Sequence, residues 1–203
     1  MAGVLELPRL PGGVVLLARE RGARSSHLRD QLHRAGLATL LLPLHAPARE
    51  RDAGAQSGIE TLCSRLAAAA DWLAAERDTM QLALGVHGGG EDGAAALRLA
   101  ASHSEQVVAL VLRGARPDLA GADVLARVRA PTLLIVGEQD GSAIEYNRGA
   151  LQQLRCEKDL SVLRGPICAN SSPRALDESA QLAARWFRGY FGGSAPAAGY
   201  PRA

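Results

Sequence analysis

The stretch "LALGVHGGGEDGAAALRLAASH", Leu82–His103, runs from a short apolar segment through three glycines into a segment rich in alanine and leucine. The apolar part predicts a buried strand over Leu82–Val86, and the remainder predicts a helix. A strand that passes through a tight turn into a helix is typical of parallel α/β proteins, in which ligands bind at the carboxyl ends of the strands. The glycine corner therefore indicates both a fold class and the place where a functional site would lie.

Similar apolar runs alternate with helical stretches along the whole chain. Most lack polar alternation, which is typical of parallel strands that are covered on both faces. We therefore predict one α/β domain over residues 1–192 with a doubly wound, mostly parallel sheet, followed by a flexible tail over residues 193–203. The expected strands are Val4–Leu7, Val14–Ala18, Ala38–Leu42, Leu82–Val86, Val107–Leu112, Thr132–Val136 and Leu160–Leu163.

Two helix starts are marked by capping residues. The segment "SGIE", Ser57–Glu60, has the spacing of a capping box, and Ser172 followed by Pro173 reads as an N-cap and first helical residue. Apolar residues at helical spacing follow both signals, so each helix presents one face to the core.

Composition narrows the class of protein. The chain has 203 residues, 47% of them hydrophobic, and a net charge of +2 carried almost wholly by arginine, with Lys158 the sole lysine. No basic stripe stands out, and no apolar run approaches the length of a membrane span, so we expect neither a nucleic-acid nor a membrane partner. The cysteines Cys63, Cys156 and Cys168 form no CxxC pair, so we expect a cytoplasmic protein with no metal site and no cofactor.

Two segments carry a resemblance to a known family. "RGARPDLAG", Arg113–Gly121, and "RAPTLLIVGEQD", Arg129–Asp140, resemble the α/β-hydrolase superfamily, and in particular bacterial dienelactone-hydrolase-like proteins. The resemblance extends over about Val14–Phe191. Only "VLELP" precedes the strand at Val14, so the N-terminal strand region is reduced relative to the full fold. The resemblance implies acyl transfer by a nucleophile, a histidine and an acid, and it places the acid at Asp140.

The resemblance places the nucleophile at the glycine corner, where no serine or cysteine stands. The register over Gly88–Asp92 puts Gly90 at the tip, with Gly89 beside it; a shift of one residue puts Glu91 there instead. We favour Gly90 and keep Glu91 as an alternative nucleophile, because acidic nucleophiles occur on this fold. A glycine tip is also what a corner released from catalysis would adopt, since glycine takes strained backbone geometry at little cost.

The histidine that the family carries after its last strand is also missing. All five histidines lie at or before His103, and the matching loop holds Cys168 or Asn170. The segment that would form the oxyanion loop has Arg19 and Glu20 where the family has a His-Gly pair. Cys168 reads either as a reactive thiol or as a buried structural residue.

Other candidate residues also have two interpretations. Asp140 is either a surviving acid or a cap on the helix expected near Ala143. His87 is either a packed histidine of the strand or a displaced base. The arginines near Arg19 either hold an acidic ligand or lie on a solvated loop.

These observations favour a degenerate α/β-hydrolase that acts as a binding or interaction module for an unknown small molecule or protein, with a homodimer as one expected assembly. The alternative is an active hydrolase of small esters or lactones that uses Asp140 with Glu91 or Cys168. A third reading is a phosphate or nucleotide binder on the Gly88–Gly90 turn, although the acids that follow this turn would repel phosphate.

Overall fold

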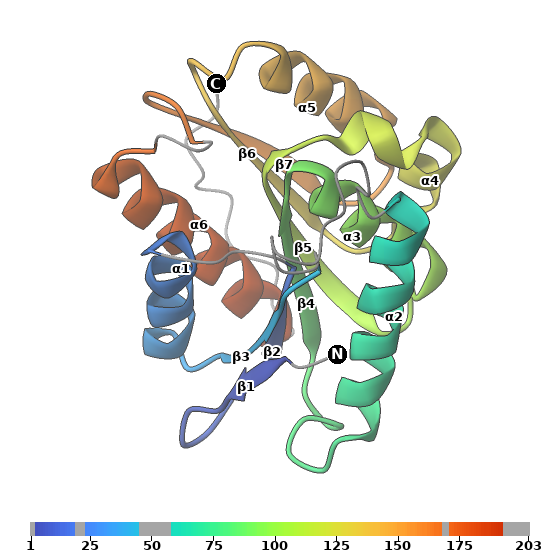
Figure 1. The fold of residues 1–203 in the computed structure, drawn as a ribbon, viewed down its shortest axis with the longest axis vertical. Helices are drawn as coiled ribbons and strands as arrows, with labels where there is room; N and C mark the ends of the chain where they lie inside the picture. Colours follow the sequence, from blue (N-terminus) through green and yellow to red (C-terminus); the bar gives the residue numbers. More distant parts are fainter. Residues whose placement is uncertain (1–2, 19–22, 45–57, 168–170, 193–203) are drawn as a thin grey trace, which may run out of the picture.

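The computed structural model describes residues 3–18, 23–44, 58–167 and 171–192. They form one seven-stranded sheet in the order β1-β3-β2-β4-β5-β6-β7 (Figure 1). Neighbouring strands run parallel except for β1, which pairs antiparallel with β3 at one edge. The strands are β1 Val4–Glu6, β2 Val14–Ala18, β3 Ala38–Leu42, β4 Leu84–Gly89, β5 Val107–Ala115, β6 Thr132–Gly137 and β7 Lys158–Leu163.

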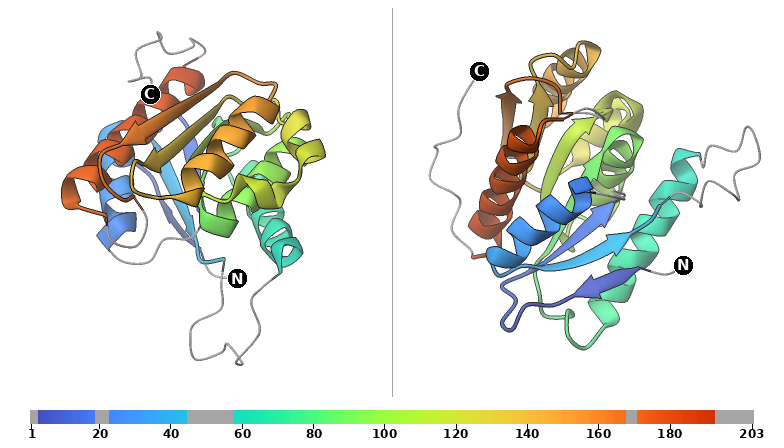
Figure 2. Two further views of the ribbon diagram at one scale, coloured as in Figure 1. Left: turned by 90° about the horizontal axis from the view of Figure 1, so that it is seen from above. Right: turned by 60° about the vertical axis from the view of Figure 1, so that its left-hand side comes forward.

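Helices cover both faces of the sheet, as Figure 2 shows in two further views. One face carries α1 (Ala23–Arg34) and α6 (Pro173–Phe191), which pack against each other. The opposite face carries α2 (Ile59–Ala75), α3 (Gly90–Ser102), α4 (Ala122–Arg127), α5 (Ser142–Gln153) and the short 3₁₀ helix η1 (Pro117–Ala120). This arrangement confirms the predicted doubly wound α/β fold.

The core has two layers because side chains of each strand alternate between the two faces. In β2, Leu16 belongs to the cluster under α2 and α3, whereas Leu17 belongs to the cluster under α1 and α6. Both layers exclude water, so the central strands are mainly apolar, with His87, Arg113 and Thr132 as their buried polar residues. The uninterrupted apolar runs of the sequence have this physical origin.

Two glycines allow α6 to approach the sheet closely. Phe187 and Phe191 of α6 stack with ring centroids 5.7 Å apart. A Cβ atom at Gly85 would lie 2.5 Å from Phe187 Cε1, and one at Gly13 would lie 2.1 Å from Phe191 Cδ2. Any larger residue at either position would push the two rings off the sheet.

Two of the seven predicted strands have the observed bounds, and the other five differ by one to three residues at one or both ends. Val14–Ala18 and Ala38–Leu42 are confirmed as predicted. Strand β4 begins two residues later than expected, because Leu82 closes a turn by donating its N–H to the Thr79 carbonyl. It also continues through Gly88 and Gly89, which pair with β5.

Both helix starts can be compared with the prediction. Ser172 caps α6 as expected, since its Oγ accepts a hydrogen bond from the Ala175 N–H at 3.2 Å. Helix α2 is capped at Gly58 without a side-chain hydrogen bond, and Ser57 lies outside the described residues. The short β1 is the one described strand before β2.

Candidate functional site

The corner between β4 and α3 has the geometry of a nucleophile elbow. The strand ends at Gly89 and the helix begins at Gly90 with no intervening loop. Gly90 has φ = +54°, in the left-handed region, and its carbonyl accepts a hydrogen bond from the Arg116 N–H at 2.9 Å. A sharp, strained strand-to-helix turn of this kind presents its tip residue at the edge of the sheet.

The residues beside the tip have no room for a larger side chain, whereas the tip itself faces open space. A Cβ atom at Gly93 would lie 2.6 Å from Ala115 Cβ, and one at Gly89 would lie 2.8 Å from the Arg113 carbonyl oxygen. A Cβ atom at Gly90 would meet no other atom within 4 Å. Packing thus requires small residues beside the elbow, whereas at Gly90 only the backbone conformation favours glycine.

This geometry distinguishes the two proposed registers. The left-handed residue is Gly90, so the register with Gly90 at the tip fits the backbone. Glu91 lies in the first turn of α3 and is exposed, where its charge interacts favourably with the helix dipole. Its position is that of an ordinary acidic residue at a helix start.

Asp140, the candidate acid, follows β6 at the same edge of the sheet. Its Oδ2 accepts hydrogen bonds from the Gly137 N–H at 2.9 Å and from the Ile167 N–H at 3.2 Å. The carboxylate therefore joins the end of β6 to the loop that follows β7. Of the two interpretations of Asp140, the one in which its side chain caps the next helix is wrong, because α5 is capped at Gly141 with no side-chain hydrogen bond.

The loop held by Asp140 packs tightly over the end of β6. A Cβ atom at Gly137 would lie 2.2 Å from the Gly165 carbonyl oxygen. The Glu138 N–H donates to the Leu163 carbonyl at 2.8 Å, and the Gly165 N–H donates to Glu138 Oε1 at 3.1 Å. Asp140 is thus one part of a compact junction between two loops.

His87 lies inside the sheet and not at its edge. It is 3% exposed on β4, three residues before the tip. Burial, together with the nearby positive charge of Arg113, lowers the pKa of His87 to about 3. An imidazole with this pKa is neutral at pH 7 and binds a proton poorly, so its environment disfavours the role of displaced base.

The other described histidines have partners elsewhere. His27 Nδ1 bonds Asp177 Oδ1 at 2.9 Å, His33 Nε2 bonds Thr39 Oγ1 at 2.9 Å, and His103 Nδ1 bonds Ser102 Oγ at 2.8 Å. None of the histidines that the structure describes contacts Asp140. His45 lies outside the described residues, as do Arg19, Glu20, Cys168 and Asn170.

One feature beside the elbow was missed at the level of sequence. The Arg116 guanidinium makes a bidentate hydrogen bond to Asp118, with Nη2–Oδ2 at 2.7 Å, and lies 4.4 Å from the centroid of the Tyr146 ring. The hydrogen bond from Arg116 lowers the pKa of Asp118. The spacing "RPD" contains the pair, but nothing in the sequence places Tyr146 of α5 beside it.

Asn147 fixes α5 against the strand next to the elbow. It is fully buried, and its Nδ2 donates to the carbonyls of Ala115 at 3.0 Å and Ala143 at 2.8 Å. Ala115 in turn forms the bridge to Gly90. The elbow and α5 are therefore positioned through the same end of β5.

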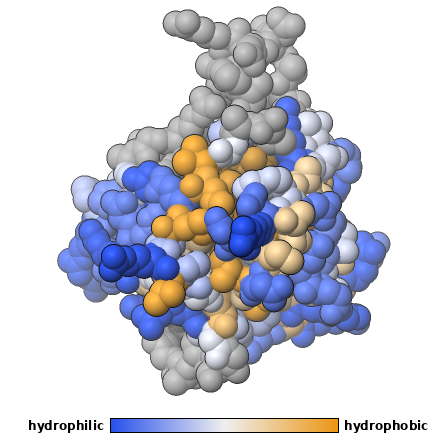
Figure 3. Space-filling view, turned by 90° about the horizontal axis from the view of Figure 1, so that it is seen from below, coloured by the Kyte–Doolittle hydropathy of each residue, from blue (hydrophilic) through white to orange (hydrophobic). Residues whose placement is uncertain are grey.

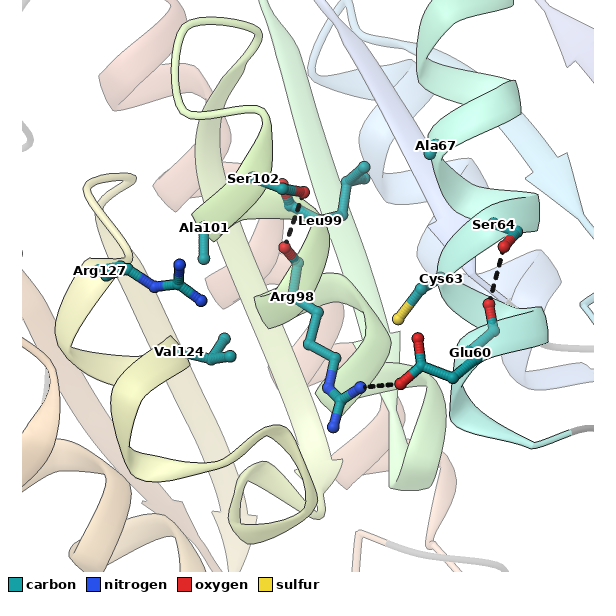
Figure 4. Close-up of a pocket in the computed structure, with 10 residues that line it drawn as sticks. All are labelled: Glu60, Cys63, Ser64, Ala67, Arg98, Leu99, Ala101, Ser102, Val124 and Arg127. Atoms are coloured by element: carbon teal, nitrogen blue, oxygen red, sulfur yellow. Dashed lines mark hydrogen bonds and ion pairs between the residues drawn. The ribbon is translucent and has the colours of Figure 1, made fainter.

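Away from the elbow, a hollow of about 410 Å³ lies between α2, α3 and α4 (Figure 4). Arg98 of α3 reaches across it to Glu60 of α2, and the Cys63 thiol lies beside this ion pair. Burial raises the pKa of Cys63, so its reactive thiolate form is disfavoured. This hollow includes neither Gly90 nor Asp140.

The described residues lack two features, a cluster of metal ligands and a helix able to span a membrane. Within these ranges no three His, Cys, Asp or Glu side chains come together as metal ligands. No described helix combines the length and apolar character that crossing a bilayer requires.

Solved structures similar to this one share its fold throughout. Est1E from Butyrivibrio proteoclasticus, solved with ferulic acid, has a TM-score of 0.77 at 13% identity and covers 94% of this chain and 95% of its own. A thermostable carboxyl esterase from Bacillus coagulans has a TM-score of 0.74 at 14% identity, with coverages of 93% and 94%. With the strand order and the elbow, these similarities define an α/β-hydrolase fold.

A further structure defines the family. The dienelactone hydrolase from Anabaena variabilis is 40% identical to this chain, with a TM-score of 0.86, and the match covers 93% of this chain and 91% of the other. The chain belongs to the dienelactone hydrolase family. This confirms the resemblance carried by Arg113–Gly121 and Arg129–Asp140. A scan against family models finds no match.

Two curated relatives have a different name. Both are called "Putative phosphoribosyl transferase", come from two strains of Mycobacterium tuberculosis, and are 39% identical over 201 residues. The match takes in 97% of this chain but only 45% of each relative. The chain thus spans less than half the length of these two proteins.

Proposed function

We propose that this chain is a dienelactone hydrolase family domain that serves as a binding or interaction module and has lost serine-type acyl transfer. The observation that carries the proposal is the elbow, whose tip is Gly90, a residue without a side chain. The space that a nucleophilic side chain would occupy is open. Loss of the nucleophile or base alone costs about 10⁶ in turnover in a well-studied serine hydrolase.

The hydrogen bonds of Asp140 support the same proposal. In an acyl-transfer triad the acid orients a histidine. Here the Asp140 carboxylate is engaged by the backbone N–H groups of Gly137 and Ile167. Its present contacts describe a residue that stabilises a loop junction.

A surface suited to a partner lies at the opposite end of the sheet. Leu10 and Met80 are 90% and 51% exposed in the loops that lead into the adjacent strands β2 and β4, and Trp72 is 45% exposed in the last turns of α2. Figure 3 shows apolar residues gathered on the face seen from below. Large apolar side chains exposed at one end of the sheet are available to a partner, and this end is the proposed contact surface.

The proposal is tested by turnover of short p-nitrophenyl esters by the wild type and by Glu91→Gln, Asp140→Ala and Arg185→Ala. We expect the same background rate in all four proteins, because no described group is placed as a nucleophile with a base. Turnover that Asp140→Ala or Glu91→Gln abolishes, but Arg185→Ala does not, would establish the alternative of an active hydrolase with a rearranged site.

A further inference from the structure

A second hollow, of about 560 Å³, lies at the edge of the sheet opposite the elbow. Its residues come from the three connections that lead into β5, β6 and β7, whereas the elbow and Asp140 follow the carboxyl ends of strands. Any ligand of this hollow is therefore independent of the elbow. We refer to it as the basic groove, because three arginines line it: Arg127, Arg129 and Arg155.

The described part of the chain provides the basic groove with one ion pair, at Arg129, and with none for Arg127 and Arg155. Arg155 is exposed and has neither an ion pair nor a side-chain hydrogen bond to any described residue. Arg129 has a single ion pair, to Glu105 at 3.7 Å, and the two side chains are 76% and 91% exposed. Such an exposed pair contributes little. Arg127 donates from Nε to the Asp123 carbonyl, and its terminal nitrogens have no hydrogen-bond partner among the described residues.

Helix ends explain only part of this charge. Arg127 lies in the last turn of α4, where a cation interacts favourably with the helix dipole. Lys158 serves α5 in the same way by donating to the Leu154 carbonyl. Arg129 and Arg155 follow the helices and donate to no described helix carbonyl, so stabilisation of the fold does not account for their convergence on one hollow.

The remaining lining residues suit an anion with an organic part. Ala101 and Ala126, both partly exposed, contribute an apolar wall, and Ser104 contributes a hydroxyl group. Burial raises the pKa of the Cys156 thiol, so this lining residue carries no negative charge at pH 7. The volume is within the range of small-molecule pockets and is larger than inorganic phosphate needs.

We propose that the basic groove binds a small phosphorylated organic anion, with Arg129 and Arg155 as the main phosphate contacts. Guanidinium groups form paired, charge-assisted hydrogen bonds with phosphate oxygens. Two such groups on separate loops, converging on one hollow, favour a compact phosphate over an extended polyanion. The wall formed by Ala101 and Ala126 would then contact the carbon skeleton of the ligand.

Calorimetric titration tests the proposal with ribose 5-phosphate, inorganic pyrophosphate and inorganic phosphate at low ionic strength, where charge interactions are least screened. We expect saturable binding at one site, with ribose 5-phosphate tighter than inorganic phosphate. The double variant Arg129→Ala/Arg155→Ala should weaken binding at least about tenfold, since hydrogen bonds to charged groups are the strong ones. Arg185→Ala on α6, an exposed arginine on the other face of the sheet, is the matched control and should bind as the wild type does.

Circular dichroism of each variant verifies the fold, and Arg155→Lys provides a milder change that keeps the charge. The proposal is overturned if none of the three anions binds at millimolar concentration. It is equally overturned if the double variant and Arg185→Ala bind alike, or if a single-stranded oligonucleotide binds through these arginines while ribose 5-phosphate does not.

Discussion

The Asp140 carboxylate and the Ile167 backbone N–H are joined by a hydrogen bond across the carboxyl edge of the sheet, with oxygen–nitrogen distances of 3.2 and 3.3 Å. The same carboxylate accepts from the Gly137 N–H. An acid at the end of a late strand is here tied to the loop in which the family carries its histidine. Because of these hydrogen bonds, we expect the removal of the Asp140 side chain to lower the stability of the protein.

We therefore predict that Asp140→Ala lowers the free energy of unfolding by about 1–3 kcal/mol, since two backbone donors lose a charged acceptor. Asp140→Asn should cost less, because its amide oxygen still accepts. Urea denaturation measures both, with Asp30→Ala as the control, since Asp30 makes only a 3.5 Å surface contact with Arg29. Equal stabilities for Asp140→Ala and Asp30→Ala would show that the junction does not depend on the carboxylate.

The elbow gives a prediction about two glycines. Gly90→Ser should cost about 1–2 kcal/mol, because the residue must keep a positive φ while its side chain meets open space. Gly93→Ser should cost more, because its Cβ would lie 2.6 Å from that of Ala115 and a buried contact must shift. Thermal and urea unfolding of both variants make the comparison.

Gly90→Ser also separates geometry from chemistry. It supplies a hydroxyl at the elbow tip but no base, so we expect no gain in ester hydrolysis over the wild type. Clear, saturable turnover by Gly90→Ser would mean that a base reaches the tip. The natural protein would then lack only the nucleophile and not the rest of the acyl-transfer machinery.

The sequence was a good guide to the fold for a physical reason. The runs at Val14–Ala18 and Ala38–Leu42 are largely buried on both faces, so they are apolar except for Thr39, and the strand boundaries stand out. At Leu82–Val86 the signal fails at both ends. Leu82 is apolar but turns, and Gly88 and Gly89 pair in the ladder although glycine is a poor strand former.

The site was harder to predict, because its contacts join residues that are distant in sequence. The pattern after β6 identified Asp140 but gave no sign of Ile167 as its partner, since the contact depends on how two loops pack. The cation–π contact of Arg116 with Tyr146 has the same character. The tip at Gly90 was predictable because an elbow is a local strand-to-helix turn.

Ser172 offers a local test of the most distinct helix signal. Ser172→Ala should lower the free energy of unfolding by about 1 kcal/mol, because the Ala175 N–H at the start of α6 loses its acceptor. Ser142→Ala is the matched control: Ser142 is the first residue of α5, and no side-chain cap is present there. Equal effects in urea denaturation would mean that water replaces the Ser172 cap at no cost.

His87 predicts a specific loss of stability in acid. The pKa of His87 is about 3 in the folded protein, against 6.5 for an ordinary histidine. Between pH 6.5 and 3 the unfolded chain therefore binds a proton at this residue that the folded protein does not bind. The contribution of His87 to the free energy of unfolding is therefore fully present above pH 6.5. As the pH falls from 6.5 toward 3, this contribution decreases by up to about 1.4 kcal/mol per pH unit.

Urea denaturation at pH 7, 5.5 and 4 measures this loss in the wild type, in His87→Gln and in His103→Gln, which alters a histidine at the end of α3. Carboxylates contribute their own pH dependence to all three proteins, so the informative quantity is the difference in slope between each variant and the wild type. His87→Gln should have a shallower slope than the wild type, and His103→Gln should not. A His87→Gln slope equal to that of the wild type would mean that the folded imidazole takes up a proton as readily as the unfolded one, and His87 would again be a candidate base near the elbow.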